Sequence, residues 1–300
     1  MANTLLTPDV IAQAALANLY ETTVMASLVH RDYEDTFAGA VGDTITIRKP
    51  AKFVAQEFNR AAGITVQDAT ESGIPMSLNH FADVSFAVTS EDLTLKITDF
   101  SERLLAPAME AIAQKIDRDL LALRSDIVIK VGTNAGELWN DPRVLLAAGR
   151  ELTKRSVPSS QRYAVTGPTM AAEWLKDDLM NRADARGDTQ GLIEAAIGRK
   201  FGFDTYETNN IVTPTPGAGI PTTEVGVAFH RTAFALAIRP LALPRGATNA
   251  AIANYKGFGL RVIYGYDMDK KQDVVSIDIL YGVKTLDPNR AVLMHGPLGS

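Results

Sequence analysis

The chain has 300 residues, of which 46% are apolar and 22% charged. This is the balance of a folded globular protein with room for one large domain or two modest ones. Thirty Lys and Arg against 35 Asp and Glu give a formal charge of −5, whereas a protein that mainly grips phosphates usually carries the opposite sign. There is no cysteine, which excludes disulfides, thiolate metal sites, iron–sulfur clusters and a cysteine nucleophile.

The first predicted element is an N-terminal helical arm. Thr7 is a suitable N-cap, and Pro8 stands at the first helical position, where its missing N–H is harmless. Apolar residues recur at helical spacing, so the helix can run on to Leu28. The stretch has no basic leader and is interrupted by Asp9 and Glu21, so we expect neither a signal peptide nor a membrane span. With little apolar mass of its own, the arm should be stable only when docked on something else.

A pattern of period two, typical of a half-buried strand, begins at residue 43. A second alternating run follows at Val84, Phe86 and Val88. We interpret 43–89 as one long antiparallel excursion with a mobile tip, because a connection this long inside a compact domain is usually functional or disordered. Its charges are segregated, with Arg48, Lys49, Lys52 and Arg60 on the first limb and Asp68 and Glu71 past the tip.

The strongest periodic signal predicts a long helix. Its apolar residues are spaced by three or four positions on one face: Leu105, Met109, Ile112, Ile116, Leu120, Leu123 and Ile127. Asp99 and Glu102 form a candidate capping box, and Pro107 either kinks the helix or marks the start of its second segment. Lys115 and Asp119 are spaced to pair on the wet face. From Pro107 onward the helix would span roughly 30 Å at ~1.5 Å per residue.

The middle of the chain, 131–256, reads as mixed α/β. Asp141 and Pro142 predict a helix that runs through Leu152 and ends near Ser156. The other predicted elements here are a short buried strand in YAVTGP (163–168), helices from near Pro168 and over 191–198, a strand pair around 203–206 and 226–237, and a surface loop over 213–224. Alternation returns over 260–281 as two strands with a charged turn, followed by a short run at 291–294. Without a repeat or a composition break, we expect one folded body with two projections, the arm and the excursion.

No catalytic constellation is visible in the sequence. The phosphate-cradling, metallohydrolase and nucleophile-elbow motifs are missing. The segment Gly257-Phe258-Gly259 is discounted as a dinucleotide loop, because no third glycine follows and the next residues are strand-like. The four histidines stand apart without a ligand-spaced neighbour: His30, His80, His230 and His295. We therefore predict no catalytic, cofactor-binding or metal-binding residues and no cofactor.

A few groups admit a functional interpretation, but for each we favour a structural one. Asp267, Asp269 and Asp273 could bind a cation, yet a charged hairpin turn is the favoured interpretation. The other groups are Asp117 and Asp119 as a solvated helix face, the adhesion-like Arg186-Gly187-Asp188 as a mobile loop, and Trp139 and Trp174 as packing residues. The basic limb of the excursion suits a neighbouring protein surface better than nucleic acid, because an acidic limb accompanies it.

Four segments of the chain carry a family resemblance: the arm MANTLLTPDVIAQAALANLYE, the strand GDTITIRKP, the segment SFAVTSEDLTLKITDFSERLLAPAMEAIAQKIDRDLL and the late segment DVVSIDILYGVKTLDP. Their order resembles that of the major capsid (coat) proteins of tailed bacteriophages, in the subgroup similar to the coat proteins of Salmonella podoviruses. The resemblance covers nearly the whole chain and is most specific in residues 1–20, 43–50, 89–123 and 274–288.

The resemblance implies an α+β fold, the tailed-phage major capsid protein fold. The apolar helical face described above would be the inner side of its spine helix. Larger relatives carry an inserted domain that this chain is too short to hold in full. The implied parts are an N-terminal arm at 1–42, an extended β-hairpin loop at 43–89, a peripheral domain with the spine helix at 90–130 and 257–300, and a mixed α/β axial domain at 131–256.

The implied function is that of a structural, non-enzymatic subunit that self-assembles into an icosahedral shell around packaged double-stranded DNA. The implied partners are further copies in hexamers and pentamers, a portal protein, and scaffolding or decoration proteins. Contact with DNA would be weak and non-specific, and no membrane would be involved. The subunit would be made in the cytoplasm of the bacterial host and reside in the virion. Lys52 makes the lysine–asparagine crosslink of some such shells imaginable, although no motif supports one.

Two other functions stay open at this point. The first is an encapsulin-like cellular nanocompartment shell that holds a protein cargo. The second is a soluble α/β enzyme whose site the sequence does not reveal. Closed particles in the electron microscope would indicate a shell, whereas monomers or dimers would indicate an enzyme. DNA inside the particles would indicate a phage capsid, and protein inside them would indicate a cellular compartment.

Overall fold

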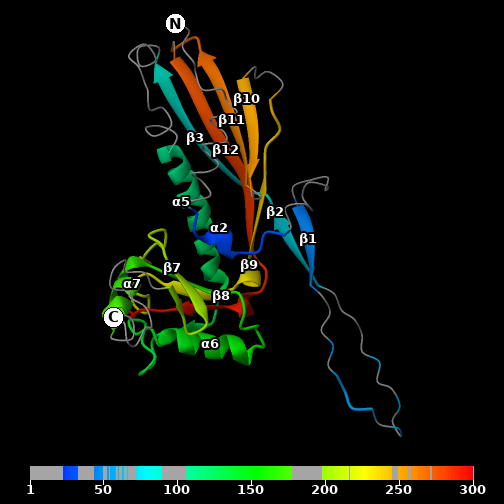
Figure 1. Cartoon of the computed structure of the whole chain (residues 1–300), viewed down its shortest axis with the longest axis vertical. Coiled ribbons are helices and arrows are strands. Elements are labelled where there is room, and N and C mark those ends of the chain that lie inside the picture. The colour runs from blue at the N-terminus through cyan, green and yellow to red at the C-terminus, as the bar shows by residue number, and fades with distance from the viewer. Residues whose placement is uncertain are drawn as a thin grey trace.

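The computed structural model describes residues 23–32, 44–49, 53, 55–58, 60, 63, 66, 72–89, 106–177, 198–215, 217–244, 249–255, 258–270 and 272–299. These residues form a long antiparallel sheet with a helix along it, a six-stranded sheet with two helices, and a separate two-stranded hairpin. The long sheet stands upright in Figure 1, the six-stranded sheet lies at its lower end, and the hairpin projects to one side.

The long sheet is assembled from strands that are far apart in the sequence. Its strands are β3 (His80–Thr89), β9 (Phe234–Arg239), β10 (Asn249–Tyr255), β11 (Phe258–Asp267) and β12 (Gln272–Thr285). The order is β10-β11-β12-β3, with β9 also paired to β12, and every pair is antiparallel. The alternating runs predicted at 84–88 and over 260–281 are confirmed as strands. On one face of the sheet, Val262, Val275 and Ile277 are fully buried.

The pairing predicted for the 43–89 excursion is wrong at its C-terminal end. Strand β1 (Thr44–Lys49) pairs with β2 (Ser72–Ser77), from Thr44 opposite Ser77 to Lys49 opposite Ser72. Strand β3 pairs instead with β12 in the long sheet. Alternation shows which face of a strand is buried but does not identify its partner, so the sequence could not separate the two pairings.

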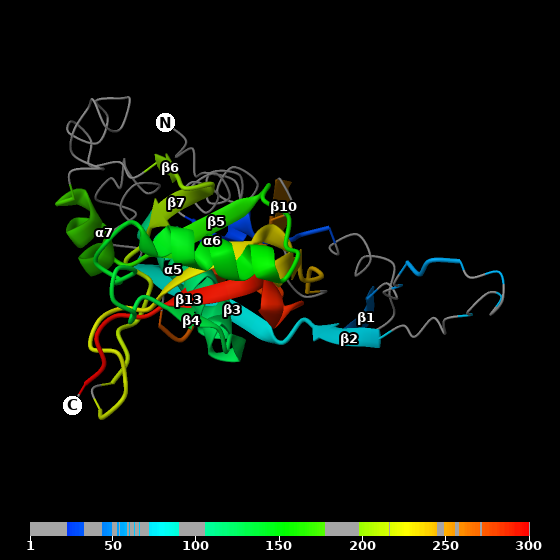
Figure 2. The same cartoon turned by 90° about the horizontal axis from the view of Figure 1, so that it is seen from below.

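The root of the β1–β2 hairpin is fixed to the body by a small apolar cluster. Its buried residues are Ile45, Ile47, Met76, Leu78, Ala235, Ala237 and Leu286. Gly282 of β12 allows the backbones to approach, since a Cβ there would lie 2.2 Å from the carbonyl oxygen of Ser77. From this root the loop extends away from the body, as Figure 2 shows from below.

The predicted long helix is α5 (Ala106–Ala122), which is followed by the 3₁₀ turn η2 (Leu123–Asp126). Pro107 lies in the first turn of α5, which fits its interpretation as the start of a helical segment. The predicted apolar face is confirmed: Met109, Ile112, Ile116, Leu120 and Ile127 are buried, and Leu123 packs partly against them. Leu105 and the proposed cap, Asp99 with Glu102, lie outside the described residues.

The second sheet is mixed and forms the lower part of the body. Its strands are β4 (Lys130–Val131), β5 (Arg162–Thr166), β6 (Gly198–Lys200), β7 (Phe203–Glu207), β8 (Gly226–His230) and β13 (Ala291–Met294). The order is β4-β13-β8-β5-β7-β6, with parallel pairs β5–β7 and β13–β4. The short run predicted at 291–294 is thus a strand of this sheet.

The strand pair predicted around 203–206 and 226–237 is wrong in two respects. Strands β7 and β8 both pair with β5 and not with each other. The run 226–237 is broken by the 3₁₀ turn η3 (Arg231–Ala233), where the His230 side chain accepts a hydrogen bond from the Thr232 N–H. The break sends β8 and β9 into different sheets, although the apolar run reads as one strand. A local polar cap inside an apolar run therefore decides the topology.

Two helices accompany the six-stranded sheet. Helix α6 (Val144–Lys154) begins two residues later than predicted, because the Asp141 side chain accepts from the Arg143 N–H and closes a preceding turn. Helix α7 (Pro168–Leu175) begins where predicted, and Trp174 is fully buried. The helix predicted over 191–198 lies outside the described residues except for Gly198, which starts β6. The chain is completed by the short turn η4 (Pro288–Arg290) before β13.

Candidate functional site

Within the described part of the chain, no group of three or more His, Asp or Glu could hold a metal ion. His230 Nδ1 lies 2.9 Å from the Thr232 hydroxyl, and burial lowers the pKa of His230 and of His295. His30 lies 3.6 Å from Asp32. Over the same described ranges, no helix has the length and apolarity that crossing a bilayer requires.

Asp119 is a structural junction. It pairs with Lys115 at 3.1 Å, which confirms the predicted i, i+4 pair, and it lies 3.4 Å from His80 Nδ1. The Tyr281 hydroxyl also donates to it, and burial together with this carboxylate raises the pKa of Tyr281 above its usual range. The His80 ring stacks on that of Tyr281 at 5.2 Å. The junction therefore ties α5 to β3 and β12.

The prediction that Asp117 lies on a solvated face is wrong. Asp117 has no exposed surface, and its carboxylate accepts from the Val24 N–H at 3.0 Å and the Met25 N–H at 3.1 Å. A signal for this was present in the sequence. Ala113 and Leu121, one turn before and after Asp117, are apolar and buried on the same face of α5.

Structural roles were also predicted for the acidic turn at 267–273 and for Trp174. Asp267 Oδ1 accepts from the N–H groups of Asp269 and Lys270, so these residues form the predicted charged turn. Burial, with a hydrogen bond to Asp273, raises the pKa of Tyr264 to about 12. The packing role of Trp174 is confirmed by its burial and by its indole N–H, which donates to the Trp139 carbonyl at 2.8 Å.

Some candidate residues lie outside the described part of the chain. They are Lys52, Asp68, Glu71, Gly257 and the tripeptide Arg186-Gly187-Asp188. Of the basic limb, Arg48 and Arg60 are described and exposed.

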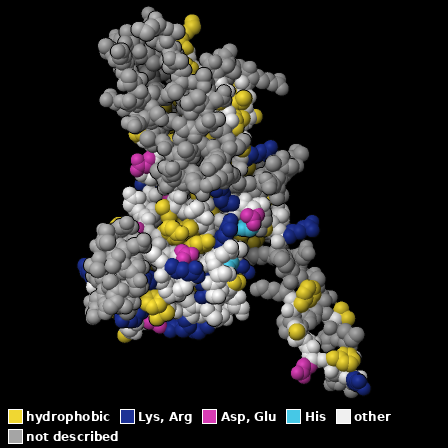
Figure 3. Space-filling view, in the orientation of Figure 1, with side chains coloured by type: hydrophobic (Ala, Val, Ile, Leu, Met, Phe, Trp, Pro, Cys, Tyr) yellow, Lys and Arg dark blue, Asp and Glu magenta, His cyan; other side chains and the backbone are white. Residues whose placement is uncertain are grey.

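The extended loop presents large apolar side chains to solvent. We call Phe53, Phe58 and Val66, with exposed fractions of 63%, 68% and 84%, the loop surface. Figure 3 shows hydrophobic side chains on the projection at the lower right, well away from the body. Exposed aromatic side chains on a projection are candidates for burial against another molecule. The loop surface is therefore the candidate functional site.

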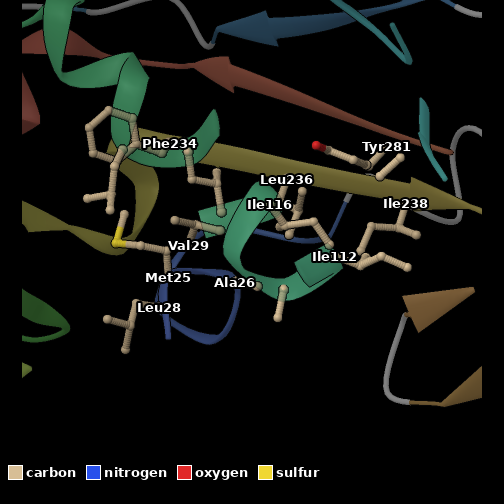
Figure 4. Close-up of a cluster of buried hydrophobic side chains, with 14 of the residues drawn as sticks. Met25, Ala26, Leu28, Val29, Ile112, Ile116, Phe234, Leu236, Ile238 and Tyr281 are labelled. Atoms are coloured by element: carbon tan, nitrogen blue, oxygen red, sulfur yellow. The ribbon is translucent and has the colours of Figure 1, made fainter. Parts of the chain in front are cut away.

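The arm behaves differently, because residues 23–32 are folded into the body. Their one-turn helix α2 (Met25–Leu28) packs on α5 and β9 (Figure 4). His30 then forms a parallel bridge with Ala235, with its N–H donating to the Phe234 carbonyl at 3.1 Å. The arm was expected to need a docking surface, and for these residues the chain supplies its own. The predicted cap at Thr7 and Pro8 lies outside the described residues.

Comparison with known proteins identifies solved structures with a similar architecture. No protein-family model and no curated protein matches the chain. A solved chain of Mycobacterium phage Che8 matches with a TM-score of 0.67 at 22% identity, over 91% of this chain and 90% of that one. The capsid of Ralstonia phage GP4 matches with a TM-score of 0.60 at 10% identity, over 91% and 88%. The virus-like particle from Pyrococcus furiosus matches with a TM-score of 0.55 at 14% identity, over 95% and 98%.

At these identities the matches establish the fold. They extend over at least 88% of each matched chain, so the likeness concerns the whole molecule and not one motif. The fold expected from the sequence resemblance is confirmed at this level. The chain has the fold of bacteriophage capsid proteins.

Proposed function

We propose that this chain is a structural major capsid protein that self-assembles into an icosahedral shell around the double-stranded DNA of a tailed phage. The observation that carries the proposal is the loop surface, which exposes two aromatic side chains on a projection anchored by its own apolar root. A second copy of the chain would bury these side chains, and the capsid fold supports that arrangement.

The subunit is proposed to consist of an arm, an extended loop, a peripheral domain and an axial domain, as the resemblance implies. The observed strand pairing supports three changes to the limits of these parts. The loop would end at Ser77, because β3 belongs to the long sheet. Strands β9 and β10 would join the peripheral part, and β13 the axial part, since each pairs there.

A closed shell follows from weak, repeated contacts. Each subunit would touch several neighbours, so modest individual contacts would multiply into a stable particle. A loss of about 1.4 kcal/mol per contact would weaken that contact tenfold. Closure would also cover sheet edges and the loop surface, which otherwise favour aggregation.

The partners remain proposals. They are copies of the chain in hexamers and pentamers, a portal protein, and scaffolding or decoration proteins. The subunit would have no enzymatic role, would be made in the host cytoplasm and would reside in the virion. The narrower likeness to the coat proteins of Salmonella podoviruses also stays a prediction.

The loop can be shortened at the end of its two-stranded hairpin. Lys49 and Ser72 are paired at the end of the hairpin, so a two-residue Asn-Gly turn can replace residues 50–71. A deletion through residue 76 would remove Met76, which is fully buried. We expect the replacement to give a folded subunit, by circular dichroism, that forms no closed particles in negative-stain microscopy.

Two point variants refine this test. Phe53→Ser with Phe58→Ser should raise the subunit concentration needed for assembly by at least about tenfold. Val128→Ser, which changes an apolar residue on the body that is 84% exposed, should leave assembly unchanged. Normal particles from the loop-replaced chain would remove the intersubunit role of the loop. A wild-type chain that stays monomeric under all assembly conditions would contradict the shell function itself.

The match to the virus-like particle from Pyrococcus furiosus supports one alternative, an encapsulin-like compartment shell. The two proposals share the assembly and differ in the cargo. Particles purified from the native source should contain nuclease-protected double-stranded DNA under the phage proposal. Protein cargo without DNA would favour the compartment.

A further inference from the structure

Strand β9 is held along both of its edges. One edge pairs with residues 280–285 of β12. The other edge is covered by residues 24–30, which we call the docked arm segment. The His30 N–H donates to the Phe234 carbonyl at 3.1 Å, and the Leu236 N–H donates to the His30 carbonyl at 3.0 Å. The end of the docked arm segment therefore lies beside β9 like a short additional strand.

The two faces of β9 belong to different buried clusters, because successive side chains of a strand point to opposite faces. Three side chains point into the main core: Phe234, Leu236 and Ile238. There they share a cluster with Met25 and Val29 of the docked arm segment, as Figure 4 shows. The docked arm segment therefore covers one face of β9 as well as one edge.

The opposite face of β9 carries the root of the β1–β2 hairpin. Ala235 and Ala237 have no exposed surface and present only methyl groups on this face. They share a cluster with Ile45, Ile47 and Met76, which lie on one face of the hairpin. Because a methyl group is short, these side chains pack close to the β9 backbone. A small displacement of β9 would therefore move the surface on which the hairpin root packs.

The hairpin depends on this packing. Strands β1 and β2 form a two-stranded sheet of six residues each. A two-stranded hairpin is marginally stable in water by itself. The hydrogen bonds between β1 and β2 should therefore resist exchange only while the hairpin root is packed on β9.

The docked arm segment is anchored to α5 at its other end. The Asp117 carboxylate accepts from the Val24 N–H at 3.0 Å and from the Met25 N–H at 3.1 Å. The Arg231 side chain, which precedes β9, donates to the Val29 carbonyl at 3.4 Å. Figure 1 shows α2 and the blue segment after it running from α5 toward the hairpin. The docked arm segment thus connects α5 to the strand that carries the hairpin root.

We propose that β9 couples the docking of the arm to the packing of the extended loop on the body. The docked arm segment holds one edge and one face of β9, and the hairpin root packs on the opposite face. Undocking would remove the two hydrogen bonds to His30 and part of the core behind β9. The strand would then shift, and the hairpin root would lose its fixed packing surface. This inference concerns the single chain and does not rest on the proposed shell function.

Three fully buried methionines allow a matched test. Met25 lies in the docked arm segment, Met76 at the hairpin root and Met170 on α7. Each belongs to a different buried cluster. Replacing a buried methionine by alanine leaves a cavity, which typically weakens the local packing equilibrium by at least about tenfold. The same substitution can therefore be made on each side of β9 and away from it.

Hydrogen–deuterium exchange on the full chain, at one pH, compares the three variants. Met25→Ala should lower the protection of residues 24–30 and also that of β1 and β2, by at least about fivefold. Met76→Ala should lower the protection of residues 24–30 as well, because coupling between two sites is reciprocal. In both variants α6 should keep its protection. Met170→Ala should lower the protection of α6 and leave the arm and the hairpin unchanged.

Loss at the hairpin in Met25→Ala together with loss in the arm in Met76→Ala supports the coupling. Unchanged protection of β1 and β2 in Met25→Ala overturns it. An equal loss in α6 also overturns it, because the effect would then spread through the whole body and not through β9. If Met25→Ala does not fold, Val29→Ala, a smaller change at a fully buried residue, is judged by the same comparison. If neither arm variant folds, unchanged protection of residues 24–30 in Met76→Ala overturns the coupling.

Discussion

Arg261 and Asp278 form an ion pair in the middle of the long sheet. Their side chains are only 13% and 3% exposed, and two guanidinium nitrogens contact the carboxylate, the shorter distance being 2.7 Å. Arg261 also donates to the Ala242 carbonyl at 2.6 Å. The residues face each other across β11 and β12. Such a pair offsets its own desolvation only while both partners are present.

Asp278→Ala should therefore destabilise the chain strongly. The substitution leaves the Arg261 guanidinium buried without its counter-ion, which typically costs about 3–5 kcal/mol. Urea denaturation monitored by circular dichroism measures the change. The double variant Arg261→Met with Asp278→Leu keeps the volume and removes both charges, so it should lie near the wild type. A single variant that loses less than about 1 kcal/mol would contradict this account.

At the scale of elements, the position of the extended loop depends on how β2 meets β12. The end of β2 runs directly over Gly282, where a Cβ would be 2.2 Å from the Ser77 carbonyl oxygen and 3.3 Å from Leu78 Cα. Both obstacles are backbone atoms, which cannot rotate away. The glycine thus sets how closely the hairpin root approaches the long sheet.

Gly282→Ala should lower stability by about 1–3 kcal/mol, because the strands must separate. Gly265→Ala is the matched control: this glycine lies in the same sheet, and nothing stands within 4 Å of its added Cβ. That change should be neutral within about 0.5 kcal/mol. Thermal melts of the two variants give the comparison, and equal melting temperatures would refute the close-approach argument.

At the scale of the whole molecule, the charge balance bears on what a shell could contain. The net charge is −5, and several of the basic residues described on the body pair with neighbouring carboxylates, as Arg150 does with Glu137 and Lys154 with Glu151. A net negative charge, together with such pairs, weakens the attraction of the chain for phosphates.

Isolated subunits should accordingly bind double-stranded DNA weakly. Filter binding should show an affinity no tighter than the usual non-specific range of about 10⁻⁴–10⁻⁶ M, with a shallow dependence on salt. A steep salt dependence with tight binding would mean that a basic surface acts on the DNA. In that case the account of weak attraction between this negatively charged chain and DNA would be wrong.

The local hydrophobic patterns of the sequence predicted many helices and strands correctly. They did not predict which strands pair with each other. The face of α5 and the strands β1, β11 and β12 follow from spacing alone, because each pattern is contained within its own segment. The division of 226–237 into β8 and β9 could not be predicted, since it depends on the turn at Thr232 and on two different partner strands. The candidate site was partly predicted: the sequence indicated a projection within 43–89, and the structure shows that Phe53 and Phe58 on it are exposed.

The sequence by itself determined the class of the chain. Its family resemblance implied the fold of phage capsid proteins, and its local patterns indicated many of the helices and strands that the structure describes. Only the tertiary structure decided that Asp117 is buried, that Met25, Ala26, Leu28 and Val29 belong to the core, and that β3 leaves the loop for the long sheet. The physical reason is that burial depends on neighbours far along the chain, such as Val24 against Asp117, and no local pattern contains that information.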